Sequence, residues 1–464
     1  MRCSTRIIPL ACSGVAVFAL ACGDGGGGGA DADTDSDADS DTDADTDTDT
    51  DSDAGADGGS DTDTDTDAPL AYNGCGIARS GIKAAGAWEE PIDAPYLPFL
   101  DHGDSSASSA DAADAYDCAP TIDERGPEVL YRFVATAPGT FHAEVACEGD
   151  ADMDVHLLQS PGFDGTTATG CLGRAHIELT VADLPAGEYW VAADTWSDGT
   201  TEFSGAYTLS FEWLADGVWS EIQVDEGVSW SRLRTSDLWG SAQTVNVLRV
   251  DPATVSDLEP ARHDGCATVA DTGEALGALA GVNAGFFDTG TGDCPALDLI
   301  KANGVLINTN QIDDPQRSMG WNEGEAPSFA WIAAGVDWPE VENAVGGHPS
   351  LVIDGAVDVE PDTGTSFYTS RHPRTAAALD GTGRLLLVTV DGRTDAGDGM
   401  TTDELAGFLI DELGAVEAIN FDGGGSTTMW VDDCWVNGVV NSPSDNGLDD
   451  HWGSRQVSDG LYLW

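Results

Sequence analysis

Lysine is nearly absent from this sequence. Among 464 residues only Lys83 and Lys301 are lysines, and all Lys and Arg together number 18 against 83 Asp and Glu, so the formal net charge at pH 7 is −65. So few cations cannot neutralise the phosphates of a nucleic acid or of an anionic lipid surface. We therefore expect no nucleic-acid partner, and an anionic ligand would need a local group of arginines.

Several catalytic and metal-binding patterns are also missing. The chain has no GxxxxGK[ST] phosphate loop, no GxSxG elbow and no HExxH, which argues against a P-loop nucleotide hydrolase, an α/β serine hydrolase and a zinc protease. No CxxC or His-rich spacing suggests zinc. We expect no cofactor and no catalytic metal. A structural calcium at Asp152 and Asp154 is left open, although a solvated pair on a strand edge is favoured.

The first 22 residues have the features of an export signal. Arg2 and Arg6 precede the apolar run "IIPLACSGVAVFALA", which is too short to span a membrane comfortably, and Cys22 follows. This arrangement resembles a bacterial lipoprotein signal in which Cys22 is lipidated; a secretory peptide cleaved after Ala21 is the alternative. Either route predicts export, and the lipid anchor would hold the protein in the bacterial cell envelope, at the outer membrane or cell surface.

Residues 23–70 form a low-complexity tether. A glycine run is followed by repeats of Asp with Thr, Ser and Ala, and from residue 25 to 68 no apolar residue larger than Ala occurs. Such a segment cannot bury a core and its like charges repel one another, so we predict a disordered, extended linker.

Residues 72–214 have the pattern of an all-β domain. "EVLYRFVATAPGTFHAEV" and "HIELTVADLPAGEYWVAADTW" each contain two alternating runs on either side of a turn with Pro and Gly. Several strands at this spacing favour a β-sandwich. The segment resembles the bacterial pre-peptidase C-terminal domain, and the resemblance implies an accessory or adhesive role rather than catalysis.

Residues 216–464 alternate β and α patterns. The apolar runs "LLLVTV" and "VEAINF" flank "TTDELAGFLIDELG", in which Thr401 and Glu404 make a capping box and Gly414 suits the helix end. Strand, helix and strand form a βαβ unit whose strands should run parallel. We therefore predict a multi-domain protein, with an N-terminal all-β sandwich and a C-terminal α/β (α+β) domain built on a mixed sheet.

The cysteines beyond the signal fall into two regions. The first region holds an even set and the second an odd set: Cys75, Cys118, Cys147 and Cys171, then Cys266, Cys294 and Cys434. Export permits disulfides. We pair Cys266 with Cys294 and leave Cys434 unassigned.

Both strands of the βαβ unit end in an aspartate that precedes glycine. Asp391-Gly392-Arg393 follows the first strand, and Asp422 precedes three glycines and Ser426 after the second. Because the carboxyl ends of parallel strands meet at one sheet edge, we expect Asp391 and Asp422 side by side, with Arg393 next to them. The glycine N–H groups could hold an anion. A tight turn is the alternative role for the glycines.

Six spaced motifs together resemble the phosphodiester glycosidase family over most of residues 245–464. They are "GVNAGFF", "GGHPSLVIDG", "HPRTAAALD", "VDGRTDAGDGMTTDELA", "AINFDGGGSTTMWV" and "VVNSPSD" with the late Arg455. The family implies hydrolysis of a sugar 1-phosphodiester at the anomeric C–O bond. Near its end the chain departs from the family pattern with an inserted "NGLDDHWG" before Ser454 and Arg455.

The resemblance and the residue chemistry together predict the site. Asp391 and Asp422 are the expected catalytic carboxylates: one would activate water or attack the anomeric carbon, and the other would orient the sugar or stabilise positive charge. Which does which is left open. The alternative for each is to cap the turn after its strand. Arginines suit phosphate oxygens, and an amide suits sugar hydroxyls. The expected substrate-binding residues are Asn283, His372, Arg374, Arg393, Gly423, Gly424, Gly425 and Ser426.

We thus expect an exported, membrane-tethered hydrolase whose partner is a carbohydrate phosphodiester of the cell envelope or of an extracellular glycan. The alternative is a non-catalytic, surface-tethered lipoprotein that binds carbohydrate or acts as an adhesin. A binding protein would not need two carboxylates at the reactive centre of an anionic ligand, which favours the hydrolase.

Overall fold

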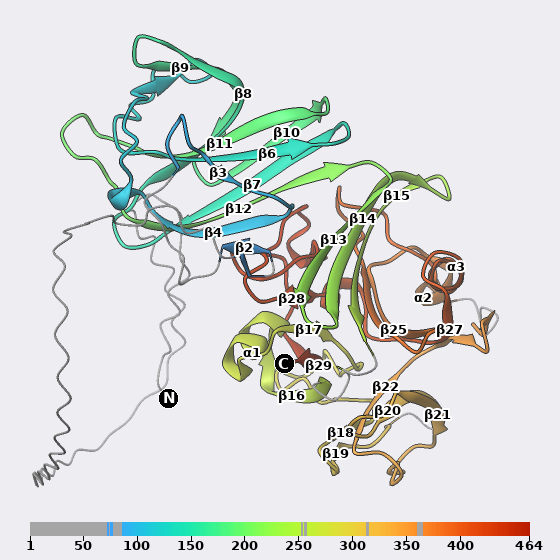
Figure 1. The fold of residues 1–464 in the computed structure, drawn as a ribbon. Helices are drawn as coiled ribbons and strands as arrows, with labels where there is room; N and C mark the ends of the chain where they lie inside the picture. Colours follow the sequence, from blue (N-terminus) through green and yellow to red (C-terminus); the bar gives the residue numbers. More distant parts are fainter. Residues whose placement is uncertain are drawn as a thin grey trace, which may run out of the picture. The chain divides into compact units, whose positions relative to one another are not determined.

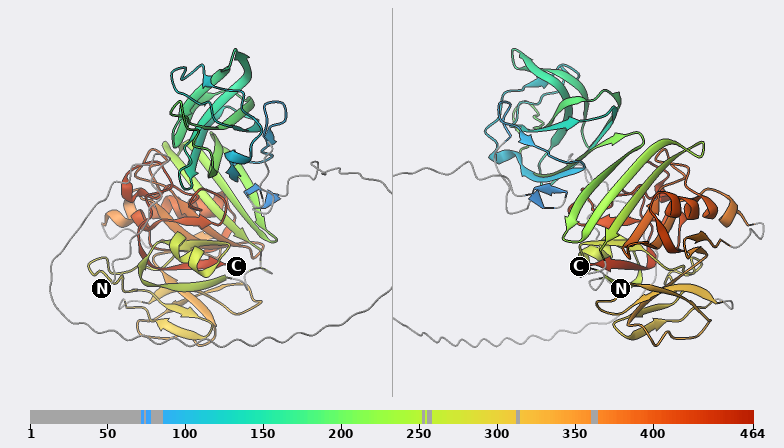
Figure 2. Two further views of the ribbon diagram at one scale, coloured as in Figure 1. Left: turned by 90° about the vertical axis from the view of Figure 1, so that its left-hand side faces the viewer. Right: turned by 45° about the vertical axis from the view of Figure 1, so that its right-hand side comes forward.

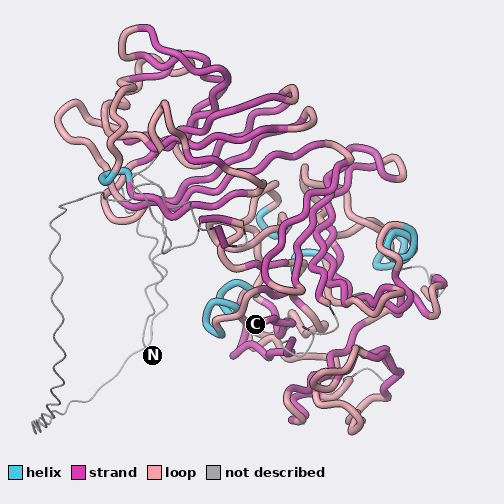
Figure 3. Tube along the Cα trace, in the orientation of Figure 1, coloured by secondary structure: helices cyan, strands magenta, loops and turns pink. Residues whose placement is uncertain are grey.

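The computed structural model describes residues 72–73, 75–77, 86–251, 254, 258–311, 315–359 and 365–464. The predicted signal, Cys22 and the predicted tether lie outside the described residues. Strands dominate the described ranges, as Figure 3 shows. The described α-helices are α1 (Val269–Leu276), α2 (Ser366–Thr369) and α3 (Thr402–Asp411). None of the described helices has the length and apolar character that crossing a membrane requires.

Two six-stranded sheets make up the N-terminal part of the described chain (Figure 1). In spatial order the first contains β1 (Tyr72–Asn73), β2 (Gly76–Ile77), β4 (Phe99–Asp104), β12 (Ala206–Ala215), β7 (Gly139–Cys147) and β10 (Glu178–Leu184). The second contains β3 (Ile92–Asp93), β6 (Val129–Ala135), β11 (Gly187–Thr195), β8 (Met153–Asp164), β9 (Thr167–Ala175) and β5 (Ala115–Tyr116).

Aromatic side chains from both sheets form one core, which makes the pair a β-sandwich. Phe141 and Phe211 of the first sheet pack against Phe133 of the second, with ring centroids 5.8 Å apart in each case. The strands on either side of each Pro- and Gly-containing turn belong to opposite sheets: β6 and β7 at one turn, β10 and β11 at the other. These turns therefore cross the sandwich.

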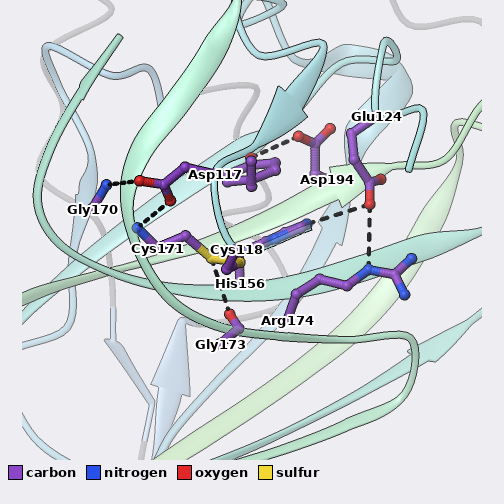
Figure 4. Close-up of a disulfide and its surroundings, with 10 residues drawn as sticks. Asp117, Cys118, Glu124, His156, Gly170, Cys171, Gly173, Arg174 and Asp194 are labelled. Atoms are coloured by element: carbon purple, nitrogen blue, oxygen red, sulfur yellow. Dashed lines mark hydrogen bonds and ion pairs between the residues drawn. A yellow bond between two sulfur atoms is a disulfide. The ribbon is translucent and has the colours of Figure 1, made fainter. Parts of the chain in front are cut away.

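A disulfide between Cys118 and Cys171 fastens the segment after β5 to β9 (Figure 4). The Asp117 carboxylate accepts the backbone N–H groups of Gly170 and Cys171, each at 3.0 Å, so hydrogen bonds next to the disulfide also hold the loop that carries Cys118. His156 lies buried beside the bridge.

The Asp152–Asp154 pair is not the solvated edge pair that we favoured. Asp154 is fully buried and forms an ion pair with Arg174. His176 Nδ1 lies 3.3 Å from Asp152 Oδ1 and 3.2 Å from Asp154 Oδ1. Two cationic or potentially cationic side chains thus already face these carboxylates.

An eight-stranded sheet organises the C-terminal part, and it joins strands that are far apart in the sequence (Figures 1 and 2). Its spatial order is β13 (Val218–Asp225), β14 (Val228–Leu238), β15 (Ser241–Val250), β26 (Leu385–Val390), β25 (Arg374–Asp380), β27 (Ala415–Asn420), β23 (Ser350–Ile353) and β24 (Ala356–Val357).

The predicted βαβ unit is β26–α3–β27, and its strands run in the same direction but do not touch. β25 lies between them and pairs antiparallel with both. Neighbouring described strands of this sheet are all antiparallel, so β26 and β27 are parallel only as next-nearest neighbours. The direct pairing that would place Asp391 beside Asp422 does not occur.

The local predictions for this unit are confirmed. The Thr401 hydroxyl accepts the Glu404 N–H, and the Glu404 carboxylate accepts the Thr401 N–H, which completes the capping box. β26 is buried on both faces: Leu387 packs in one apolar core, and Leu386 packs in another together with Phe408 of α3.

Two smaller sheets complete the C-terminal part. One contains β16 (Leu258–Ala267), β29 (Val457–Leu463), β17 (Ala280–Asn283) and β28 (Met429–Val431). The other contains β19 (Val305–Asn308), β18 (Ile300–Ala302), β22 (Asn343–Gly347), β20 (Gln316–Trp321) and β21 (Ser328–Ile332).

Disulfides also brace the C-terminal part. The predicted Cys266–Cys294 bridge is present, with a Cα–Cα distance of 5.4 Å. Cys434, which the sequence left unassigned, pairs with Cys75 across 359 residues. Cys75 therefore does not pair within the even set to which we assigned it, and the bridge ties the start of the sandwich to the C-terminal part.

Candidate active site

A cavity of about 380 Å³ lies at the edge of the large sheet where β26 and β27 end. Because β25 runs in the opposite direction, its first residue, Arg374, reaches the same edge. The cavity is lined by Phe286, Ser366, Phe367, His372, Arg374, Arg393, Asp422, Gly423, Gly424, Gly425 and Arg455.

Asp422 is the carboxylate of this cavity. It follows β27 directly, its backbone N–H donates to the Ala284 carbonyl at 2.8 Å, and its Oδ1 accepts the Gly423 N–H at 2.9 Å. Burial raises the pKa of Asp422 to about 6, against the opposing effect of hydrogen bonds from Ser426 and Gly423. Near pH 7 the Asp422 carboxyl is therefore mostly ionised, and its pKa is close enough to the pH for it to accept and release a proton.

Arg393 and His372 face each other across the cavity rim. Arg393 Nη2 donates to His372 Nδ1 at 3.0 Å, and His372 Nε2 lies 3.3 Å from the Ser366 carbonyl. Burial, together with the charges of Arg393 and Arg374, lowers the pKa of His372, so the imidazole is neutral near pH 7. Arg393 is exposed and has no carboxylate partner among the described residues, which leaves its charge available for an anion.

Arg374 contributes charge from a fixed position. Its side chain is buried, its Nε donates to the Met400 carbonyl at 2.8 Å, and its Nη2 donates to the Phe367 carbonyl at 2.6 Å. Burial lowers the pKa of Arg374 to about 10, and the charge of Arg393 contributes to that shift. These bonds leave only part of the guanidinium available for a bidentate contact with phosphate.

Each of the three glycines occupies a position that a side chain would disturb, for a different reason in each case. A Cβ on Gly423 would lie 2.7 Å from the Pro373 carbonyl, and Gly424 adopts a φ of +64°, which side chains disfavour. A Cβ on Gly425 would overlap the ion pair of Asp445 and Arg455.

The anion nest predicted from the glycines is partly occupied by the protein itself. The Gly423 N–H bonds to the Asp422 side chain, and the Gly424 N–H bonds to the Pro373 carbonyl at 2.9 Å. The glycines therefore serve first to let the chain pass closely between neighbours, and the arginines carry most of the attraction for an anion.

Ser426 and Arg455 support the Asp422 loop. Ser426 is buried and hydrogen-bonds Asp422. Arg455 Nε and Nη2 bond the two carboxylate oxygens of Asp445, both at 2.7 Å, and the charge of Arg455 lowers the pKa of Asp422.

Asp391 and Asn283 do not line the cavity. Asp391 is fully buried, and its Oδ1 accepts the Asn441 side-chain N–H at 2.9 Å and the Ser442 N–H at 3.1 Å. Asn283 is also buried, and its amide holds the Asp422 carbonyl at 2.6 Å and the Thr375 hydroxyl at 2.7 Å. Both side chains hold loops inside the protein and are not exposed to the cavity. Neither can therefore contact a substrate there in the catalytic or sugar-binding role that we predicted.

Two carboxylates behind the cavity were missed by the sequence reasoning. Asp298 Oδ2 accepts the Phe286 N–H, and Asp459 Oδ1 accepts the Gly285 N–H, both at 2.7 Å. Each has a second oxygen that is buried without a hydrogen-bond partner in the described structure. Burial raises the pKa of Asp298 to about 7 and that of Asp459 to about 6, and the charge of Asp422 contributes to the shift of Asp298.

Two aromatic side chains form the apolar wall of the cavity. The rings of Phe286 and Phe367 lie 6.0 Å apart in an edge-to-face arrangement, and the Arg374 guanidinium lies 5.0 Å from the Phe367 centroid. Phe286 is thus a cavity residue. Single carboxylates inside the apolar runs "ALDLI" and "SDGLYLW" were the available signal for Asp298 and Asp459.

Part of the chain matches a known protein family. Residues 276–464, which include Asp422 and its glycines, match the profile of the family described as phosphodiester glycosidase. Over these residues the chain is similar to the phosphodiester glycosidase family, and the six motifs noted in the sequence all lie within the matched range. The resemblance of residues 72–214 to the pre-peptidase C-terminal domain stays a prediction.

Similar proteins include two mammalian enzymes named N-acetylglucosamine-1-phosphodiester alpha-N-acetylglucosaminidase. The mouse protein is 32% identical over 250 residues, covering 49% of this chain and 47% of its own length. The human protein is 30% identical over 230 residues, covering 44% and 42%. The chain thus matches less than half the length of these relatives.

One similar solved structure is the catalytic domain of zebrafish N-acetylglucosamine-1-phosphodiester alpha-N-acetylglucosaminidase, auto-inhibited by its pro-peptide. It aligns with a TM-score of 0.42 and 24% identity, and the alignment covers 53% of this chain and 83% of the zebrafish chain.

Proposed function

We propose that this chain hydrolyses a sugar 1-phosphodiester at the anomeric C–O bond, with Asp422 as the reacting carboxylate. One observation carries the proposal: Asp422 lines the same cavity as Arg393, a cation without a carboxylate partner among the described residues. A phosphodiester joined to a sugar needs these two features within one ligand's length, because positive charge develops at the anomeric carbon while negative charge develops on the departing phosphate.

The chemistry follows from which group leaves. A phosphate monoester is a better leaving group than a sugar alkoxide, so it departs with little help from a general acid. Arg393 stabilises its growing charge, and the neutral His372 holds the guanidinium in place through the 3.0 Å contact.

The Asp422 carboxylate then either stabilises the oxocarbenium-like carbon and attacks it, or takes a proton from the attacking water. Asp298 and Asp459 fix the Gly285–Phe286 backbone beside the cavity. Burial raises the pKa of Asp422 to about 6, and the charge of Asp459 adds to that shift.

The mammalian relatives' names point to N-acetylglucosamine 1-phosphodiesters as the first substrates to test. The expected outcome for Asp422→Asn is a folded protein whose kcat/KM falls by about 10²–10⁴-fold, because the amide keeps the shape but loses the charge. Asp391→Asn is the matched control and should retain turnover. Near-normal turnover in folded Asp422→Asn would refute the assignment, and binding of the diester without turnover by the wild type would favour the carbohydrate-binding alternative.

Export and lipid anchoring through Cys22 complete the proposal. Disulfides persist in oxidising compartments, and the chain forms bridges at Cys75–Cys434, Cys118–Cys171 and Cys266–Cys294, which supports export. Anchoring would place the enzyme where envelope or extracellular glycans are its substrates.

A further inference from the structure

Three buried side chains meet where the sandwich contacts the C-terminal part. His142 is on β7, Glu212 is on β12, and His451 is in the loop that precedes β29. They are 7%, 2% and 2% exposed, and one possible ligand atom from each lies within 4.8 Å of the other two. The residues are too far apart in the sequence to form a local motif, so no spacing pattern could reveal them.

The hydrogen bonds of both histidines leave one ring nitrogen facing the shared centre. His451 Nδ1 lies 2.8 Å from the Asn441 carbonyl oxygen, which only accepts, so Nδ1 carries the hydrogen and the neutral ring keeps its lone pair on Nε2. His142 Nε2 lies 3.2 Å from a Glu178 oxygen, which leaves Nδ1 toward Glu212. Histidines that ligate metals usually donate their other N–H to a carbonyl or carboxylate in this way.

One oxygen of Glu212 has only a long contact with His142 and could turn to an ion. Glu212 Oε2 forms an ion pair with Arg232, whereas Oε1 lies 3.4 Å from His142 Nδ1. A direct hydrogen bond between charged groups is usually about 2.7–2.9 Å long, so the His142 imidazole and the Glu212 carboxylate are too far apart for a strong one. Glu178 contacts His142 and adds a further carboxylate to the group, and Arg232 pairs with Glu212.

Space for a bound water adjoins the three side chains. A cavity of about 60 Å³ is lined by His142, Glu212 and His451 together with Arg232, Ser442 and Asp449. That volume exceeds what one water molecule needs, and the walls offer polar partners for it.

We propose that His142, Glu212 and His451 bind one Zn²⁺, with a water as the fourth ligand. Two imidazoles and one carboxylate match the donor set and the number of protein ligands of tetrahedral zinc with an open position. Ca²⁺ and Mg²⁺ prefer shells made of oxygen alone, so this donor set selects against them. The site is independent of the proposed hydrolysis, since its residues do not line the cavity of Asp422.

The ion would fasten the sandwich to the C-terminal part. The Asn441 carbonyl that accepts from His451 belongs to the residue whose side chain holds Asp391, so the zinc ligands connect directly to the loops at the sheet edge. The competing arrangement is a metal-free, protonated His142 held between Glu212 and Glu178.

Zinc titration of the full chain tests the site. The protein is stripped with a chelator and titrated with Zn²⁺ in a large excess of Ca²⁺, which occupies the acidic tether without competing for imidazole ligands. We expect about one tightly bound Zn²⁺ per chain by calorimetry and elemental analysis, and a rise in Tm on binding. His451→Ala should lose both, and Co²⁺ in place of Zn²⁺ should give the visible spectrum of a tetrahedral site in the wild type alone.

His102→Ala is the matched control. His102 of β4 also links the two parts, through a contact of 3.3 Å to Asp433. It lies outside the proposed ligand set, so His102→Ala should keep full zinc binding. The proposal is wrong if the wild type takes up no stoichiometric zinc under excess Ca²⁺, a result that does not depend on any variant folding. It is equally wrong if folded His451→Ala binds zinc as the wild type does.

Discussion

Replacing Asp391 by Asn should raise stability at alkaline pH and leave turnover intact. Burial raises the pKa of Asp391 from 3.8 to about 7. The ionised carboxylate loses its hydration inside the protein, and its hydrogen bonds with Asn441 and Ser442 offset only part of that free-energy cost. The Asn441 and Ser442 donors both reach Oδ1, which an asparagine retains, and Oδ2 has no hydrogen-bond partner in the described structure.

The sign of the effect follows from proton binding. Between about pH 4 and pH 7 the folded protein holds a proton on Asp391 that the unfolded chain has lost, so stability falls as the pH rises through this window. A shift of about three pKa units corresponds to about 4 kcal/mol. Asn does not ionise, so the variant should match the wild type near pH 4 and exceed it by up to about 4 kcal/mol near pH 8.

Denaturant unfolding of both proteins near pH 5 and near pH 8, with turnover measured on the same samples, tests this prediction. A stability difference that is equal at the two pH values would show that the folded protein carries an ionised, well-compensated Asp391. A large loss of kcat in a folded Asp391→Asn variant would show that Asp391 takes part in catalysis.

Three further changes probe the loops and the anchor. Gly425→Ala should destabilise the fold and lower kcat/KM, since its Cβ would displace the ion pair of Asp445 with Arg455; an unchanged Tm would contradict this close packing. Arg393→Lys should weaken inhibition by free phosphate by about tenfold, because the charge stays but the fork is lost, and unaltered inhibition would place the anion elsewhere. Cys22→Ser should move the protein from the detergent phase to the aqueous phase, and equal partitioning of both forms would leave plain secretion.

The sequence predicted those features whose causes are local. The capping box of Thr401 and Glu404 and the doubly buried strand 385–390 depend on residues within one element, and both are present. The position of Asp422 at a cavity with Arg393 followed from strand direction, which a helical crossover fixes.

The features that the sequence did not predict depend on contacts between distant segments. β25 enters between β26 and β27, and this single insertion separates Asp391 from Asp422. Asp298 and Asp459 matter because backbone N–H groups of the Gly285–Phe286 turn reach them, and the Cys75–Cys434 bridge spans most of the chain. The spacing of residues in the sequence does not indicate which distant segments will come into contact.

The most direct test of the central claim is the position of the bond that breaks. Wild-type protein is given an N-acetylglucosamine 1-phosphodiester in water enriched in heavy oxygen, and the products are weighed by mass spectrometry. The account predicts that the label enters the released sugar, because water replaces phosphate at the anomeric carbon. Label in the phosphate product, or no turnover of any sugar 1-phosphodiester by the folded protein, would contradict it.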